Sequence, residues 1–312
     1  MRIAIIGAGM AGLACGTRLV NRGHNVTLFD KGRGPGGRMA TRRAEVHGTT
    51  LHFDHGAQYF TVTDPRFAEQ VSAWEVTGVV ARWPAAGEGA WVGTPGMNAP
   101  VRALAQALEV RFGVRVEALE RDERGWRLAG EDLPRARFDA VLVAVPAEQV
   151  AALVAPHAAA FAAQAEATVS EPCWTLMLAF DGAVDHADTL RNAGAIGWAA
   201  RNSAKPGRGR GECWVVQASP SWSREYLEAE RDTVIALLVE HFRQQVGGAL
   251  PAIVHADAHR WRYALCAIAE GEGALWDAEQ RIGLCGDWLV GPRVEGAWLS
   301  GMTLADMVEA NG

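Results

Sequence analysis

Lysine is the scarcest charged residue in this chain, because Lys31 and Lys205 are the only lysines among 30 basic residues. Chemistry that needs a lysine is therefore confined to two positions. Long apolar runs are also missing: none approaches the roughly 20 residues that cross a bilayer, so we expect no membrane-spanning helix. The net charge of −6 argues against a nucleic-acid partner, although a local basic pocket for an anion is compatible with it.

Paired cysteines are absent as well. The five cysteines are scattered and none forms a CxxC pair: Cys15, Cys173, Cys213, Cys266 and Cys285. This pattern indicates free thiols in a reducing compartment, with no disulfide framework and no metal site. Residues 2–15 also allow a short signal or lipoprotein segment, but three glycines interrupt the apolar run, which favours a buried strand. We expect a cytoplasmic protein, with a monomer as the default.

What is present is an ordinary globular composition, with 49% hydrophobic and 21% charged residues among 312. Such a chain buries a large core and makes one to three domains.

The N-terminus carries a nucleotide-binding pattern. A short apolar run at residues 3–6 is followed by GAGMAG at 7–12, a predicted helix to residue 22 and a second strand that ends on Asp30. Gly7 permits the turn, Gly9 admits a pyrophosphate, and Gly12 lets the helix pack on the strand. The helix N-terminus then favours the phosphates, and Asp30 is correctly spaced for ribose hydroxyls. The spacing predicts a dinucleotide site.

A second glycine-rich loop favours FAD over NAD. Residues 31–39 read KGRGPGGRM, where a simple NAD enzyme would run directly into its next helix. Such a loop offers a further anion site, and Arg38 can pair with phosphate through two hydrogen bonds. The alternative is a flexible surface loop.

Five further motifs carry a family resemblance: GGRMATRR at 36–43, FDHGAQYFT at 53–61, HRWRYA at 259–264, GDW at 286–288 and VEGA at 294–297. With them the chain resembles the amine-oxidase-like FAD superfamily and, within it, the bacterial renalase branch. The resemblance covers nearly the whole chain. It implies non-covalent FAD held by Gly7, Gly9, Met10, Ala11, Gly12, Asp30, Lys31, Gly37, Arg38, Met39, His55, Gly56, Ala57, Gln58, Val116, Gly286, Asp287, Glu295, Gly296 and Ala297.

The resemblance also implies where these groups act. Residues 55–58 would lie against the isoalloxazine, Val116 against the adenine, and Asp287 at the ribityl or pyrophosphate. Residues 295–297 would open the last helix beneath the flavin, where a helix N-terminus stabilises the reduced, anionic ring. Plainer roles stay open: His55 as a loop hydrogen bond, Asp287 as a helix cap, and Trp288 and Trp298 as core.

The predicted fold class is α/β: a discontinuous Rossmann-type FAD-binding domain with a second, substrate domain on a mixed β-sheet. The FAD domain is assigned residues 1–65, 96–149 and 280–312, and the substrate domain residues 66–95 and 150–279. We expect strands at 138–145, 174–180, 213–218 and 282–286, helices at 226–245 and 297–309, and an exposed loop at 202–211 that could meet a phosphate.

A renalase-like enzyme would take hydride from a non-standard dihydronicotinamide, a 2- or 6-dihydro isomer of NAD(P)H, and pass electrons to O2. The products would be NAD(P)+ and H2O2. The donor becomes aromatic by losing hydride alone, so no strong base is needed. Candidates for holding the nicotinamide are Tyr59, His259, Trp261 and Trp288, with Arg262 for phosphates; the alternative for the His and Trp residues is core packing.

Rival chemistries stay open. Monoamine oxidases place a lysine near the flavin, and here only Lys205 could serve, by folding inward. Cys266 lies roughly where those enzymes bond a cysteine to the flavin, although a small buried thiol is the simpler interpretation. An amine or amino-acid oxidase, a desaturase, a non-catalytic flavin redox sensor and an NAD-binding protein are the alternatives, since fold alone does not fix function.

Overall fold

The N-terminal pattern forms the first βαβ unit, as the sequence predicts. In the computed structural model, which describes residues 1–269 and 271–310, β1 (Arg2–Ile6) and β2 (Asn25–Asp30) run parallel, with α1 (Met10–Asn21) between them. The strands lie in a six-stranded sheet of order β16-β17-β10-β1-β2-β7. Its other members are β7 (Glu109–Phe112), β10 (Ala140–Val143), β16 (Leu275–Asp277) and β17 (Ile282–Leu284).

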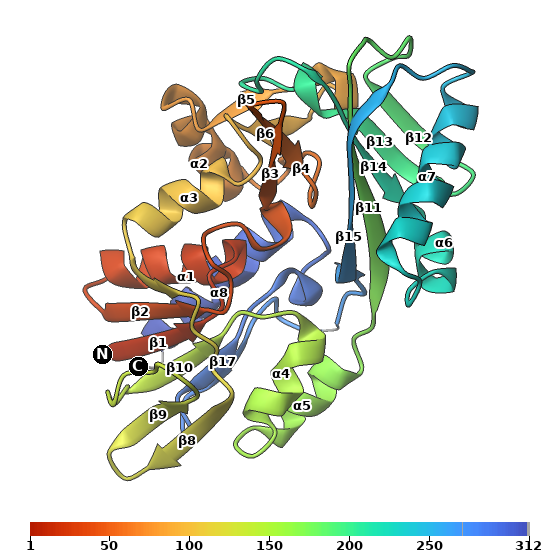
Figure 1. Ribbon diagram of the computed structural model, residues 1–312. Coiled ribbons are helices and arrows are strands. Elements are labelled where there is room, and N and C mark those ends of the chain that lie inside the picture. The colour runs from red at the N-terminus through yellow and green to blue at the C-terminus, as the bar shows by residue number, and fades with distance from the viewer. Residues whose placement is uncertain (270, 311–312) are drawn as a thin grey trace.

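Both faces of this sheet are covered, as the apolar sequences of its inner strands β1, β2, β10 and β17 require. Ile3 and Ile5 point toward one cluster with α1, α3 (Ala99–Gln106) and α8 (Val294–Ala310). Ala4 and Ile6 point into a second cluster. That second layer contains α4 (Ala147–Val154), α5 (Ala159–Glu166) and the hairpin of β8 (Ala118–Asp122) and β9 (Gly125–Ala129). Figure 1 shows α1 and α8 on one side of the sheet and the β8–β9 hairpin on the other.

A second sheet stands beside the first, at the right in Figure 1. Its order is β12-β13-β14-β11-β15, and the strands are β11 (Ser170–Phe180), β12 (Thr189–Ala193), β13 (Ile196–Arg201), β14 (Glu212–Ala218) and β15 (Ile253–Cys266). Along β11, Trp174, Leu176 and Leu178 face α6 (Pro220–Glu225) and α7 (Arg231–Gln245). Alternate residues Met177 and Ala179 face the hairpin of β3 (Thr41–Val46) and β4 (Thr49–Asp54), as the two-residue period of a strand requires.

The predicted α/β class is confirmed, but the prediction that the second domain is built on a mixed sheet is wrong. The six-stranded sheet is the mixed one, since β16 pairs antiparallel while the other pairs are parallel, and all pairs described in the second sheet are antiparallel. Among the described residues, no helix combines the length and apolar character needed to cross a bilayer.

The segment at residues 66–95 lies between the two units. This segment forms α2 (Pro65–Val76), β5 (Val80–Arg82), a short 3-10 turn (Pro84–Ala86) and β6 (Trp91–Gly93). Phe67 of α2 packs on Trp298 of α8, with ring centroids 5.4 Å apart, and the segment's apolar side chains share the core of α1 and α8. The same segment also contacts the second sheet, because the Ala85 and Ala86 carbonyls accept from the Thr189 hydroxyl and the Arg191 guanidinium of β12. Residues 66–95 therefore pack against both units, and their assignment to the substrate domain stays a prediction.

Residues 202–211 also differ from expectation. The glycine-rich, basic composition predicts an exposed loop, yet Asn202 is fully buried and Lys205 is 2% exposed. Asn202 opens a 3-10 turn (Asn202–Ala204), and its side-chain amide donates to the His52 carbonyl at 2.8 Å. The first half of the segment folds inward because the β3–β4 hairpin supplies polar partners for its side chains. In the second half Gly207, Gly209, Arg210 and Gly211 are exposed, as predicted.

Candidate functional site

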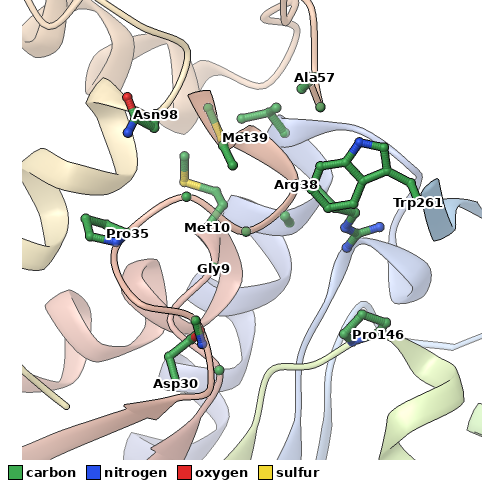
Figure 2. A pocket seen from close by; sticks show the side chains of 18 of the residues that line it. Gly9, Met10, Asp30, Pro35, Arg38, Met39, Ala57, Asn98, Pro146 and Trp261 are labelled. Atoms are coloured by element: carbon green, nitrogen blue, oxygen red, sulfur yellow. The ribbon is translucent and has the colours of Figure 1, made fainter. Parts of the chain in front are cut away.

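A cavity of about 2320 Å³ extends from the N-terminal glycine turn to the second sheet. Ordinary ligand pockets measure roughly 300–1,000 Å³, so this one has room for a dinucleotide and a second ligand. Figure 2 shows Asp30 and Pro146 at one end, Ala57 and Trp261 toward the other, and Arg38 with Met39 between them. An extended cofactor could therefore lie along this wall, from Asp30 past Arg38 toward Trp261.

The glycine turn is shaped for a phosphate. Gly7 has a φ of +102°, and a Cβ there would lie 2.4 Å from the Ala144 carbonyl oxygen. A Cβ on Gly9 would meet nothing within 4 Å, so this glycine leaves open space along the cavity wall. Met10 then begins α1, whose first N–H groups have no partner within the helix. Together these features form an anion site at a helix N-terminus.

Asp30 is held by the backbone around it. Its Oδ2 accepts from the Ala8 N–H at 2.7 Å, and its Oδ1 accepts from the Gly32 N–H at 2.6 Å. A carboxylate has about four acceptor sites, so capacity remains for ribose hydroxyls. Lys31 donates to Gln149 at 2.7 Å beside it, and burial followed by the nearby Arg115 lowers the pKa of Lys31. Val116 lines the same end of the cavity.

Arg38 and Asp287 meet across the middle of the site. The guanidinium Nη2 lies 2.5 Å from Asp287 Oδ1, and both residues line the cavity. Arg38 comes from a 3-10 turn (Gly37–Met39), and Asp287 from another (Asp287–Leu289) that follows β17. Cys266 lies against this pair, where burial and then the Asp287 carboxylate raise the pKa of its thiol to about 12. Its thiol stays protonated, and Cys266 is not among the described residues that line the cavity.

The far end of the cavity is built on residues 55–59 and β15. His55 is 5% exposed, and its ring lies 5.1 Å from that of Trp261 and 5.0 Å from that of His259. The Trp261 indole Nε1–H donates to the His55 carbonyl at 2.7 Å. Burial, the neighbouring histidine and Arg42 lower the pKa of His55 to about 3, and burial and Arg42 lower that of His259 to about 4. Both rings are therefore neutral at physiological pH.

A buried cluster of charged side chains contacts Gln58 at this end of the cavity. Lys205 Nζ lies 3.2 Å from Asp54 Oδ2 and donates to Gln58 Oε1 at 3.1 Å, while Arg208 Nη2 lies 2.5 Å from the same Asp54 oxygen. Burial alone would raise the pKa of Asp54, but the two cations hold it well below its usual range. Burial and Arg208 lower the pKa of Lys205 to about 8 despite the attraction of Asp54. Lys205 thus fixes Gln58, which lines the cavity.

The second sheet contributes one row of residues that crosses all five strands. The register pairs Arg191 with Trp198, Trp198 with Gln217, Gln217 with Thr175, and Thr175 with His259. Trp198 and Gln217 line the cavity. Sequence reasoning missed both, because their neighbourhood depends on the register of strands far apart in the chain and no local motif marks them.

Most predicted site residues line the cavity, including Tyr59, Ala297 and Gly286. The structure places five elsewhere: Gly12, His259, Trp288, Glu295 and Gly296. At Gly12 and Gly296 an added Cβ would meet backbone oxygens at 2.1 and 2.3 Å, so both serve close packing. Trp288 is 1% exposed and belongs to the core cluster of α4 and α5, not to a substrate wall.

Glu295 also differs from its predicted place beneath the flavin. Its Oε1 accepts from the N–H groups of Thr63 and Asp64 at 2.7 and 2.8 Å, and its Oε2 accepts from the Thr63 hydroxyl at 2.6 Å. The carboxylate therefore anchors the segment before α2. His259, behind His55, receives a contact from Arg42 Nη2 at 3.3 Å.

The charges on the cavity wall are unevenly distributed. The basic side chains that line it are Lys31, Arg33, Arg38, Arg42, Arg43, Arg102, Arg115, Arg262 and Arg293, and the acidic ones are Asp30, Glu117, Glu148 and Asp287. All four acids come from the nucleotide-binding unit. In the described part of the second sheet, β11 to β15, no carboxylate reaches the cavity.

Comparison with known families agrees with this geometry. Residues 5–74 match an NAD(P)-binding Rossmann-like domain, and residues 83–308 match the flavin containing amine oxidoreductase family. The chain belongs to the flavin containing amine oxidoreductase family. The cavity beside the Gly9 turn has room for the flavin that this family contains, and the enzyme class is a flavin-containing oxidoreductase.

Solved structures share the fold at low identity. A putative protoporphyrinogen oxidase from Exiguobacterium sp. 255-15 is 14% identical, covers 100% of this chain and 99% of its own, and has a TM-score of 0.77. Wild-type putrescine oxidase bound to putrescine is 14% identical, covers 99% of each chain and has a TM-score of 0.75. A 4,4'-diapophytoene desaturase from Staphylococcus aureus (strain Newman) is 54% identical over 39 residues, 12% of this chain and 8% of that protein. The chain therefore spans only a small part of this relative.

Proposed function

We propose that this protein is an FAD-dependent oxidase of dihydronicotinamide dinucleotides, specifically the 2- or 6-dihydro isomers of NAD(P)H. The net reaction is dihydronicotinamide plus O2 plus H+, giving NAD(P)+ and H2O2. When bound, FAD supplies the hydride acceptor and the route for electrons to oxygen. The resemblance of residues 53–61 and 259–264 to renalases motivates the choice of donor.

The observation that carries the proposal is the charge of the cavity. Its wall has nine basic and four acidic side chains, and its second-sheet part has no described carboxylate. The pyrophosphate of FAD needs only some of these cations, and Arg33, Arg43 and Arg102 have no carboxylate partner among the described residues. Opposite charge raises the local concentration of an anionic ligand. A second, anionic dinucleotide would pair with these cations, and the cavity is large enough to hold it beside the FAD.

The aromatic wall supports the same choice. Arg191 already lies over Trp198 at 4.4 Å and over Tyr59 at 5.8 Å from the ring centroids. An alkylammonium group on these rings would compete with that cation for the same π-electrons. A dihydropyridine ring is neutral, so Arg191 would not repel it.

The chain's own residues have orienting roles in this reaction. Asp30 and the helix N-terminus at Met10 would hold the adenosine and phosphates of FAD, with Arg38 and Asp287 beside them. Trp261 fixes the His55 backbone, and Lys205 fixes Gln58, so the wall facing the donor is rigid. His55 and His259 stay neutral, which suits a step in which the donor loses hydride without losing a proton.

Steady-state turnover in air tests the proposal. Purified FAD-loaded protein should consume 6-dihydro-NAD or 2-dihydro-NAD and release NAD+ and H2O2 in equal amounts, with matching O2 uptake. Ordinary NADH, the matched control with the same charge and size, should be oxidised far more slowly. Turnover of putrescine or amino acids, with none of the dihydro isomers, would contradict the proposal.

An amine or amino-acid oxidase is the second candidate, and one observation favours it. Monoamine oxidases place a lysine near the flavin, and Lys205 does fold inward here. It donates to Gln58, a residue of the cavity wall. Against it, the Lys205 side chain is fully buried behind that wall and already paired with Asp54. The same turnover experiment separates the two candidates.

A further inference from the structure

The buried cluster of Asp54, Lys205 and Arg208 holds more positive than negative charge. Their side chains are 0%, 0% and 2% exposed, and both cations face the same carboxylate oxygen, at 3.2 Å from Lys205 Nζ and 2.5 Å from Arg208 Nη2. The cations hold the pKa of Asp54 well below its usual range, and burial lowers the pKa of Lys205 only to about 8, so all three groups are charged at pH 7. One carboxylate cancels one cation, and one positive charge remains in excess.

This excess charge lies one side chain away from the cavity. Lys205 Nζ donates to Gln58 Oε1 at 3.1 Å, and Gln58 lines the cavity beside Ala57. Figure 2 shows Ala57 and Trp261 at the end of the cavity opposite Asp30. A flavin dinucleotide with its adenosine at Asp30 and its pyrophosphate at the helix N-terminus therefore has its flavin ring at the end where Gln58 lies.

A charge at this place acts differently on the two redox states of the flavin. Reduction by hydride adds two electrons and one proton, so the neutral ring becomes an anion. A buried cation behind the wall stabilises the anion, because little water intervenes to screen the interaction. The neighbouring rings of His55 and His259 are neutral at pH 7, and Arg42 is paired with Asp257 at 2.8 Å, so these groups do not cancel the excess charge.

We infer that the excess positive charge of the Asp54–Lys205–Arg208 cluster raises the reduction potential of the bound flavin. The cluster acts through the cavity wall by electrostatic attraction, and Lys205 needs no contact with the ring. The hydrogen bond from Lys205 to Gln58 is a separate, positioning role. Only a bound flavin is required, so the effect is the same whether the hydride donor is a dihydronicotinamide or an amine.

Three variants separate the charge from the position of Gln58. Lys205→Met and Arg208→Gln each leave a single cation facing Asp54, so the cluster becomes neutral in both. No described hydrogen bond joins Arg208 to Gln58, so Arg208→Gln removes the charge and keeps the bond from Lys205. Lys205→Met combined with Asp54→Asn leaves Arg208 alone, and the excess positive charge returns although Gln58 has lost its donor.

The midpoint potential of the bound flavin at pH 7 is the quantity to measure, by anaerobic equilibration with a reference dye. A unit charge about 10 Å away, at an effective dielectric constant of about 20, changes an equilibrium roughly tenfold. For a two-electron couple a tenfold change corresponds to ~30 mV. Lys205→Met and Arg208→Gln should therefore each lower the potential by about 30 mV, and the double variant should return it close to the wild-type value.

Arg243→Gln is the charge-matched control. Arg243 lies on α7, is 49% exposed and pairs with Glu240 at 2.8 Å. Its replacement removes the same unit of charge at the surface, where water and salt screen it, so the potential should stay at the wild-type value. Flavin content is measured first for every protein, and Arg208→Gln supplies the test by itself should Lys205→Met fail to retain flavin.

Two results would overturn the electrostatic role. Wild-type potentials in both single variants would show that the cluster's charge does not reach the flavin. A lowered potential in Lys205→Met that Arg208→Gln lacks, or that the double variant keeps, would assign the effect to the position of Gln58. None of these results depends on which donor the protein oxidises, so the proposed function stands or fails separately, on the turnover experiment.

Discussion

The buried cluster of Asp54, Lys205 and Arg208 should contribute strongly to the free energy of unfolding. Asp54 is fully buried, and its Oδ2 faces both cations, while its Oδ1 accepts from the Thr41 hydroxyl at 2.8 Å and the Met97 N–H at 2.9 Å. In Asp54→Asn the Oδ1 bonds survive, but an N–H2 group replaces the anion in front of two cations. The side chains of Lys205 and Arg208 are 0% and 2% exposed, so water cannot compensate.

The expected cost is the cost of leaving a buried charge unpaired, about 3–5 kcal/mol in the free energy of unfolding. Adding Lys205→Met to Asp54→Asn removes one of the two stranded charges and should recover part of that loss. The double variant is therefore predicted to be more stable than Asp54→Asn alone, although it carries one more change in the core.

Urea unfolding followed by far-UV circular dichroism measures these differences. Asp306→Asn is the matched control, because Asp306 is 47% exposed and pairs with Arg18 at the surface, where an ion pair contributes at most about 1 kcal/mol. Wild-type stability in Asp54→Asn, or a double variant less stable than Asp54→Asn, would refute the reasoning.

Three further predictions follow from the cavity. Gly9→Val should abolish flavin retention, because the valine side chain would point into the open space where the phosphates are expected. The free energy of unfolding of the flavin-free protein should stay nearly unchanged. A flavin content equal to that of wild-type protein would contradict this prediction. His55 and His259 have folded pKa values of about 3 and 4, below the ordinary 6.5, so the unfolded chain takes up protons first on acidification. Stability should therefore fall as pH drops from 6.5 toward 4, by up to ~1.4 kcal/mol per unit for each histidine, and a variant with both changed to Gln should show a flatter profile in urea titrations. Acid precipitation should release the flavin from wild-type protein and from Cys266→Ala alike, since the thiol has a pKa of about 12 and lies off the cavity wall; flavin that stays with wild-type but not with Cys266→Ala would show a covalent bond.

The sequence predicts the parts of the site that one continuous segment builds. The turn from Gly7 to Gly12 with Asp30 after the next strand encodes its geometry locally, and the structure has it there. The closing helix also begins where the motif at residues 294–297 indicates. The direction of the Glu295 side chain was not predictable, because it depends on Thr63 and Asp64, more than 200 residues away.

The second sheet shows why the rest could not be predicted. Trp198 and Gln217 meet only through the register of β13 and β14, and a shift of one strand by one residue would place them on opposite faces of the sheet. Lys205 lies in a segment whose glycines and basic residues indicate a surface loop. Its burial depends on two partners far along the chain, the Asp54 carboxylate and the Gln58 side-chain oxygen. Polar residues buried by partners far along the chain leave no local pattern.

The central claim is that a dihydronicotinamide dinucleotide is the hydride donor, and anaerobic single-turnover mixing tests it most directly. The FAD-loaded protein is mixed, without oxygen, with 6-dihydro-NAD, with 2-dihydro-NAD and with putrescine at equal concentrations, and the visible flavin band is followed. We predict rapid and complete bleaching by a dihydro isomer, with NAD+ formed in the same amount, and no bleaching by the amine. Bleaching by putrescine alone would contradict the claim and identify an amine oxidase.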